Sequence, residues 1–101
     1  MKSALLFTAL SLGLAAPALA DLALATSKNC MSCHAVERKV LGPSFKDVAA
    51  KYRDNKGAVD LLATKIMKGG SGVWGPVPMP ANTQVSDADA KKLAAWVLGA
   101  K

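Results

Sequence analysis

The chain is poor in the side chains from which most enzyme and metal sites are built. Its 101 residues include one histidine, two cysteines, two tryptophans, two phenylalanines and one tyrosine. No dense basic block is present, and with so few aromatic residues a nucleic-acid partner is not expected. The longest apolar run, Ala4–Ala16, is shorter than the ~20 residues that cross a bilayer, so no membrane anchor is expected either.

The first twenty residues have the pattern of a secretory signal peptide. One early cation, Lys2, precedes the apolar run, and Pro17 breaks that run just before an A-x-A cleavage pattern that ends at Ala20. A second A-x-A pattern ends at Ala25 and is an alternative cleavage point. The residue directly after the cleavage point is Asp21 and not a cysteine, so a lipoprotein anchor is not expected. The sequence predicts a signal peptide over residues 1–20 and export to the periplasm.

The exported part is one small domain, residues 21–101. Removing 20 of the 101 residues leaves 81, and domains of this size often need a staple in addition to their apolar core. A disulfide across two intervening residues would close a very short loop and stabilise little. We therefore expect a different staple. We also expect the domain to be a monomer.

The charge of the chain is basic and evenly spread. The formal net charge is +6, and loss of Lys2 with the signal peptide lowers it to +5. The scattered lysines either form an ordinary solvated surface or steer the protein toward an acidic partner. The sequence leaves both interpretations open.

The hydrophobic pattern after the signal peptide is helical and contains no convincing strand. The adjacent Gly69 and Gly70 end the expected helix that precedes them. Ser86, with Asp89 three residues later, is a good N-cap for the last helix. The expected helices cover residues 21–29 with Asp21 as cap, residues 45–52, residues 58–68, and the segment from Ser86 to Gly99. A long loop rich in proline, residues 71–85, lies before the last helix. The prediction is an all-α domain of about four short helices.

Both cysteines and the only histidine stand within five positions, in Cys30-Met31-Ser32-Cys33-His34. Residues three and four apart share one side of a helical turn, so Cys30, Cys33 and His34 can face one object. Two thiols and an imidazole match the two vinyl groups and the iron of haem, and C-x-x-C-H is the attachment motif of c-type haem. The sequence predicts one covalently attached haem c, with His34 as an axial iron ligand.

Three other interpretations of the motif compete with haem. A redox dithiol normally occurs in a βαβ context, which this pattern lacks. Structural zinc needs four ligands, and the chain has no further Cys or His. A plain disulfide is the ordinary structural alternative in an exported protein.

A second axial ligand must come from a methionine or be absent. Met1 leaves with the signal peptide, Met31 lies inside the motif, and Met67 is expected in the core. Met79 stands between Pro78 and Pro80 in a stiff extended segment, and its thioether is a soft ligand that raises the reduction potential of haem iron. Met79 is the favoured candidate, and the alternative is an ordinary loop hydrophobe.

Four stretches of the mature region carry a resemblance to a known family. They are CMSCHAV (residues 30–36), VLGPSFKDVAAKY (40–52), GSGVWGPVPMPAN (70–82) and KLAAWVLGAK (92–101). With them the chain resembles the small bacterial class I cytochromes c of the c-551 type. The resemblance implies the class I cytochrome c fold around one haem, with Met79 as the second axial ligand.

The same resemblance implies roles around the iron ligands. The Pro43 carbonyl would accept a hydrogen bond from the His34 ring, and the Trp74 indole would bond a haem propionate. The Asn82 amide would donate to the Met79 sulfur, and Lys65 would lie near a propionate. Pro43 as a simple turn residue, Trp74 as a core residue and Lys65 as a solvated cation are the ordinary alternatives.

Two axial protein ligands leave no open iron position, which favours an electron carrier over an enzyme. By resemblance, a cytochrome bc complex would be the donor, and nitrite reductase or a terminal oxidase the acceptor, in respiration or denitrification. The alternatives are a haem enzyme or gas sensor in which Met79 dissociates, and a thiol–disulfide oxidoreductase.

Overall fold

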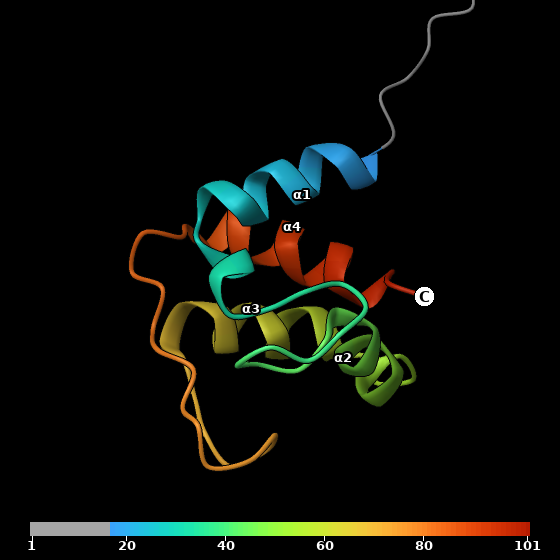
Figure 1. The fold of residues 1–101 in the computed structure, drawn as a ribbon. Coiled ribbons are helices and arrows are strands. Elements are labelled where there is room, and N and C mark those ends of the chain that lie inside the picture. The colour runs from blue at the N-terminus through green and yellow to red at the C-terminus, as the bar shows by residue number, and fades with distance from the viewer. Residues whose placement is uncertain (1–16) are drawn as a thin grey trace, which may run out of the picture.

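The computed structural model describes residues 17–101, which form four α-helices and one short 3₁₀ turn (Figure 1). Most of the predicted signal peptide, residues 1–16, lies outside the described residues. The elements are α1 (Pro17–Ser27), the 3₁₀ turn (Cys30–Ser32), α2 (Phe45–Tyr52), α3 (Ala58–Lys68) and α4 (Asp87–Leu98). The all-α architecture expected from the sequence is confirmed.

The ends of three helices follow local signals in the sequence. The Ser44 hydroxyl accepts a hydrogen bond from the Asp47 N–H at 3.1 Å and begins α2. The Ser86 hydroxyl caps α4 in the same way through the Asp89 N–H, also at 3.1 Å. Helix α3 covers the expected residues and ends at Gly69, whose N–H donates to the Lys65 carbonyl.

Helix α1 begins earlier than the sequence indicated. The expected cap was Asp21, but the helix starts at Pro17 and Asp21 lies inside it. Alanine and leucine are strong helix formers and proline is tolerated in a first turn, so the apolar segment continues the helix across the predicted cleavage point. The Asp21 side chain instead lies against α4, 3.8 Å from the Lys92 ammonium.

The core is small and is centred on α4. Helices α1, α2 and α3 all pack against α4, which lies in the middle of the molecule in Figure 1. Alanines in the helix contacts let the backbones approach closely. The buried side chains of this core are Ala25, Phe45, Val48, Leu62, Ala63, Val85, Ala90, Leu93, Ala94 and Val97. With so few large apolar residues inside, the fold fits the expectation of a domain that needs a staple.

The long loop leaves α3 at one end of the molecule and returns to α4 along its side (Figure 1). In the described part of the chain its only strand-like feature is an isolated antiparallel bridge between Gly70 and Met79. None of the helices in residues 17–101 has the length and apolar content to span a membrane.

Candidate cofactor site

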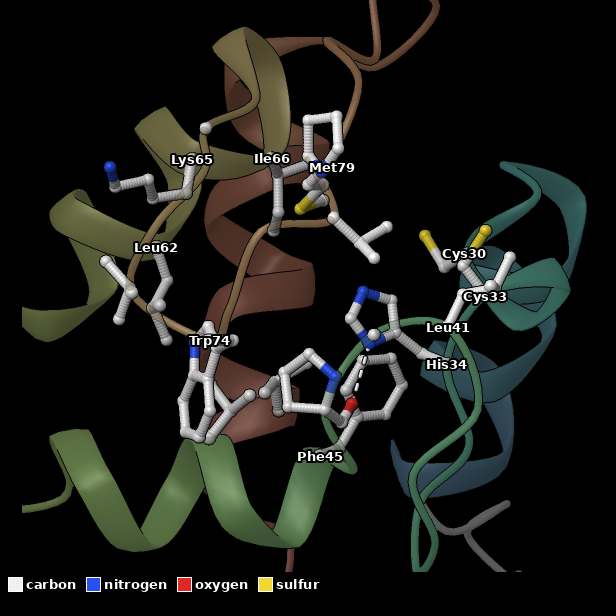
Figure 2. A pocket seen from close by; sticks show the side chains of 18 of the residues that line it. Cys30, Cys33, His34, Leu41, Phe45, Leu62, Lys65, Ile66, Trp74 and Met79 are labelled. Atoms are coloured by element: carbon white, nitrogen blue, oxygen red, sulfur yellow. Dashed lines mark hydrogen bonds between the residues drawn. The ribbon is translucent and has the colours of Figure 1, made fainter.

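A largely apolar pocket of about 380 Å³ opens between the cysteine segment, the loop before α2, helices α2 to α4 and the long loop (Figure 2). Seven of the eight predicted site residues line it: Cys30, Cys33, His34, Pro43, Lys65, Trp74 and Met79. The exception is Asn82. Segments separated by more than forty residues in the sequence therefore meet at one cavity.

The cysteine segment bends so that its functional groups face the pocket. Asn29 has the left-handed φ of 67° and begins the 3₁₀ turn. The N–H groups of Cys33 and His34 both donate to the Cys30 carbonyl, at 3.2 and 3.0 Å. In Figure 2 the two cysteine sulfurs lie together on one side of the pocket, next to the His34 ring. This arrangement presents two thiols and one imidazole to the same cavity.

The Cys30 thiol is poorly suited to redox chemistry of its own. Burial raises the pKa of Cys30 above the usual 9.0, and a backbone hydrogen bond lowers it in part. Reactive dithiols depend on a thiolate with a lowered pKa. The direction of the shift therefore disfavours a thiol–disulfide oxidoreductase.

The His34 ring is held in one orientation by a backbone carbonyl. Its Nδ1 lies 2.8 Å from the Pro43 carbonyl oxygen. Because a carbonyl only accepts hydrogen bonds, Nδ1 must carry the proton, which leaves the lone pair of Nε2 free to bind a metal. Such an outer hydrogen bond is typical of ligating histidines, and it also makes the imidazole a stronger donor.

Two neighbours of His34, which the sequence analysis missed, also hold the ring. Phe45 stacks on it with centroids 5.0 Å apart and an angle of 26° between the planes. A Cβ at Gly42 would overlap the ring, approaching Nδ1 to 2.8 Å and Nε2 to 3.0 Å. Gly42 stands directly before Pro43, the residue expected to bond the His34 ring. This position was the signal in the sequence that the backbone at Gly42 lies close to that ring.

Met79 reaches the pocket from the other end of the cavity. Its side chain is half-buried and points inward in Figure 2, above His34 in that view. Its N–H donates to the Gly70 carbonyl at 2.8 Å, and its carbonyl accepts from the Gly70 N–H at 3.0 Å. The backbone at Met79 is thus fixed from two directions, by this bridge and by the flanking prolines.

The structure gives the Asn82 amide a different partner from the one expected. Its Nδ2 donates to the Ile66 carbonyl at 2.8 Å, and its backbone N–H donates to the same oxygen at 3.2 Å. This carbonyl lies in the last turn of α3, where helix carbonyls lack internal partners, so it is a strong acceptor for a passing amide. The amide has a second N–H, and its contact with the Met79 sulfur stays a prediction.

Trp74 and Lys65 lie at the edges of the pocket. Trp74 is 41% exposed, and the Lys51 ammonium lies over its ring, 5.6 Å from the centroid. Lys65 lies beside Gly70, where a Cβ would come within 3.2 Å of its Nζ. Contact of either side chain with a propionate stays a prediction.

The groups around the pocket fit a covalently bound haem c. They comprise two thiols side by side, one imidazole with a free Nε2, a thioether and an apolar lining. A zinc site is not supported, since residues 17–101 contain no cluster of three or more His, Cys, Asp or Glu side chains placed to hold a metal ion. Iron held by imidazole and thioether is typical of cytochromes c.

The chain is similar to known proteins over most of its length. The family model for cytochrome c matches residues 22–101. Cytochrome c-552 of Nitrosomonas europaea is 55% identical over 103 residues, covering 100% of both chains. Cytochrome c-551 of Allochromatium vinosum is 53% identical, over 92% of this chain and 97% of that protein. The crystal structure of wild-type Nitrosomonas europaea cytochrome c552 superposes with a TM-score of 0.78 at 57% identity, covering 79% of this chain and 99% of that one.

Proposed function

The chain belongs to the cytochrome c family, as a small class I member of the c-551 type, and we propose that it is a periplasmic electron carrier whose haem iron is ligated by His34 and Met79. The family makes it a haem electron-transfer protein with one covalently bound haem c. When bound, the haem supplies one-electron chemistry between Fe(II) and Fe(III). The axial ligands, the compartment and the partners are our proposals.

The convergence of four groups on one pocket carries the proposal. Cys30 and Cys33 would hold the haem through thioether bonds, and His34 and Met79 would bind the iron. The ring of His34 and the backbone of Met79 are each fixed by hydrogen bonds to the main chain. Ligands held in this way move little when the charge of the iron changes, which suits an electron carrier better than an enzyme.

The outer residues would tune the site. The Pro43 carbonyl would keep Nε2 of His34 available, as it does in the structure. Trp74 and Lys65 would face the propionates at the pocket edge, and Asn82 would support the Met79 sulfur while it bonds Ile66. These assignments follow the resemblance of the chain to c-551 proteins.

The proposed partners are redox proteins of a respiratory or denitrifying chain. A cytochrome bc complex would donate electrons, and nitrite reductase or a terminal oxidase would accept them. Electron-transfer encounters use small transient interfaces, often below ~1,200 Å². Exposed apolar side chains at the pocket, Leu41 and Val77 at 60% each, would lie in such an interface. The net charge of +5 that remains after loss of Lys2 would steer the approach. The protein would act as a monomer after cleavage at Ala20.

Two matched methionine variants test the ligand assignment. Met79→Leu removes the thioether but keeps an apolar side chain of similar volume, and Met67→Leu makes the same change at a half-buried core residue of α3 outside the pocket lining. The reduction potential should fall in Met79→Leu, because the soft sulfur ligand is lost, and stay unchanged in Met67→Leu. An unchanged potential in Met79→Leu would refute the assignment of Met79.

A further inference from the structure

The end of helix α3 meets the loop at Met79. Gly69 closes the helix with its N–H on the Lys65 carbonyl at 2.8 Å. The next residue, Gly70, then forms the two hydrogen bonds of the bridge to Met79. Gly69 is the residue that turns the chain from the helix into this bridge.

The backbone of Gly69 can be adopted only by glycine. Its φ of 73° and ψ of −169° lie in a region that other residues essentially do not occupy. The space beside it is also filled. A Cβ at Gly69 would overlap the Met79 carbonyl oxygen and come within 2.9 Å of backbone atoms of Pro80 and Ala81. Backbone atoms cannot rotate away, so a side chain here would displace the Met79 segment itself.

The adjacent glycine is under no such restriction. The φ of Gly70 is not positive. A Cβ at Gly70 would meet only the flexible side chain of Lys65, with Nζ at 3.2 Å and Cδ at 3.4 Å. Alanine at this position keeps both backbone hydrogen bonds to Met79. Gly70 is therefore a matched control for Gly69 in the same turn.

The loop is fastened again just after Met79. The two hydrogen bonds from Asn82 to the Ile66 carbonyl tie it to the last turn of α3. Met79 itself forms the bridge to Gly70, and the attachment at Asn82 follows three residues later. Because the bridge is formed by the Met79 backbone, a movement of this backbone away from the pocket breaks the bridge next to Gly69.

We propose that Gly69 is a positioning residue for Met79, and that its close contact with the Met79 backbone sets how easily an external ligand displaces this methionine from the iron. The inference rests on the proposed ligation by His34 and Met79. An external ligand binds only when the loop is open, so its apparent affinity depends on the open fraction. A side chain at Gly69 strains the closed loop and is relieved when the bridge opens, which raises that fraction.

Imidazole titration of the ferric holoprotein tests the proposal, with binding followed by visible absorption. Gly69→Ala should bind imidazole about 5- to 150-fold more tightly than the native protein, the factor that corresponds to one residue forced into this backbone region. Gly70→Ala should remain within about twofold. In parallel, hydrogen exchange of the Gly70 and Met79 amides should accelerate in Gly69→Ala and not in Gly70→Ala.

Each other outcome overturns the proposal. Equal tightening in both variants would mean that neither glycine is special, and no tightening in Gly69→Ala would mean that the contact does not control Met79. Loss of folded holoprotein in Gly69→Ala alone would show that the whole fold requires Gly69, so that its role is not specific to Met79. The variant Met79→Leu distinguishes failure of the Gly69 proposal from failure of the proposed function. If Met79→Leu binds imidazole no more tightly than the native protein, Met79 is not the ligand and both proposals fail.

Discussion

Replacement of Phe45 tests whether the site and the core share one support. Phe45 is 6% exposed and is the first residue of α2. One face of its ring stacks on His34, and it meets Trp96 of α4 edge-on with centroids 5.4 Å apart and an angle of 72°. It thus connects the histidine of the pocket with the central helix.

The expected cost can be estimated from these contacts. Truncation of a buried phenylalanine to alanine costs about 3–5 kcal/mol of unfolding free energy. Two aromatic contacts contribute roughly 0.5–1.5 kcal/mol each beyond buried area, so Phe45→Leu, which keeps much of the volume, should lose about 1–3 kcal/mol. A domain of 81 residues has a total stability of roughly 4–12 kcal/mol. Phe45→Ala should therefore remove at least about a quarter of the unfolding free energy.

Guanidinium unfolding of the holoproteins, followed by circular dichroism, measures both losses. The denaturant concentration at the unfolding midpoint should be highest for the native protein, lower for Phe45→Leu and lowest for Phe45→Ala. The dependence of the unfolding free energy on denaturant should be similar in all three. If Phe45→Ala loses less than about 1 kcal/mol, the ring is not a main support of this core, and the reasoning from its burial is wrong.

Two further substitutions test local geometry. Gly42→Ala should lower the unfolding free energy by about 1–3 kcal/mol and shift the reduction potential, because the new Cβ displaces the His34 ring. Gly57→Ala should do neither, because its Cβ would make only an ordinary contact with the Asn55 side chain at 3.5 Å. An unchanged potential in Gly42→Ala would contradict the predicted close approach. Ser86→Ala should lower the unfolding free energy, measured by thermal or guanidinium unfolding, by about 1 kcal/mol through loss of the α4 cap. Thr83→Ala, at an exposed loop position, should change it by less than about 0.5 kcal/mol. Equal losses in the two variants would argue against the cap.

The local signals in the sequence were sufficient for three of the four helices. Ser44 and Ser86 are strong caps and Gly69 is a strong stop, so the start of α2, the end of α3 and the start of α4 follow from neighbouring residues. The predicted start of α1 at Asp21 was wrong, because the residues before Asp21 also favour helix and extend α1 back to Pro17. Propensity over the whole segment outweighed the single cap residue.

The residues that line the site were largely predictable from the motif and the family resemblance, whereas the backbone contacts that hold them were not. Spacing alone brought Cys30, Cys33 and His34 together. The adjacent glycines after α3 were interpreted as a helix stop, and the structure also places them against the backbone of Met79. Likewise, the attachment of Asn82 to Ile66 joins residues 16 positions apart through a helix-end carbonyl, which no periodicity signals.

The most direct test of the account is the visible spectrum of the reduced holoprotein with and without carbon monoxide. If His34 and Met79 both bind the iron and the loop holds Met79 as described, the spectrum will be that of a low-spin c-type haem and will not change when carbon monoxide is added. A spectrum that shifts with carbon monoxide would mean an open or labile iron position, and the protein would then be a haem enzyme or a gas sensor.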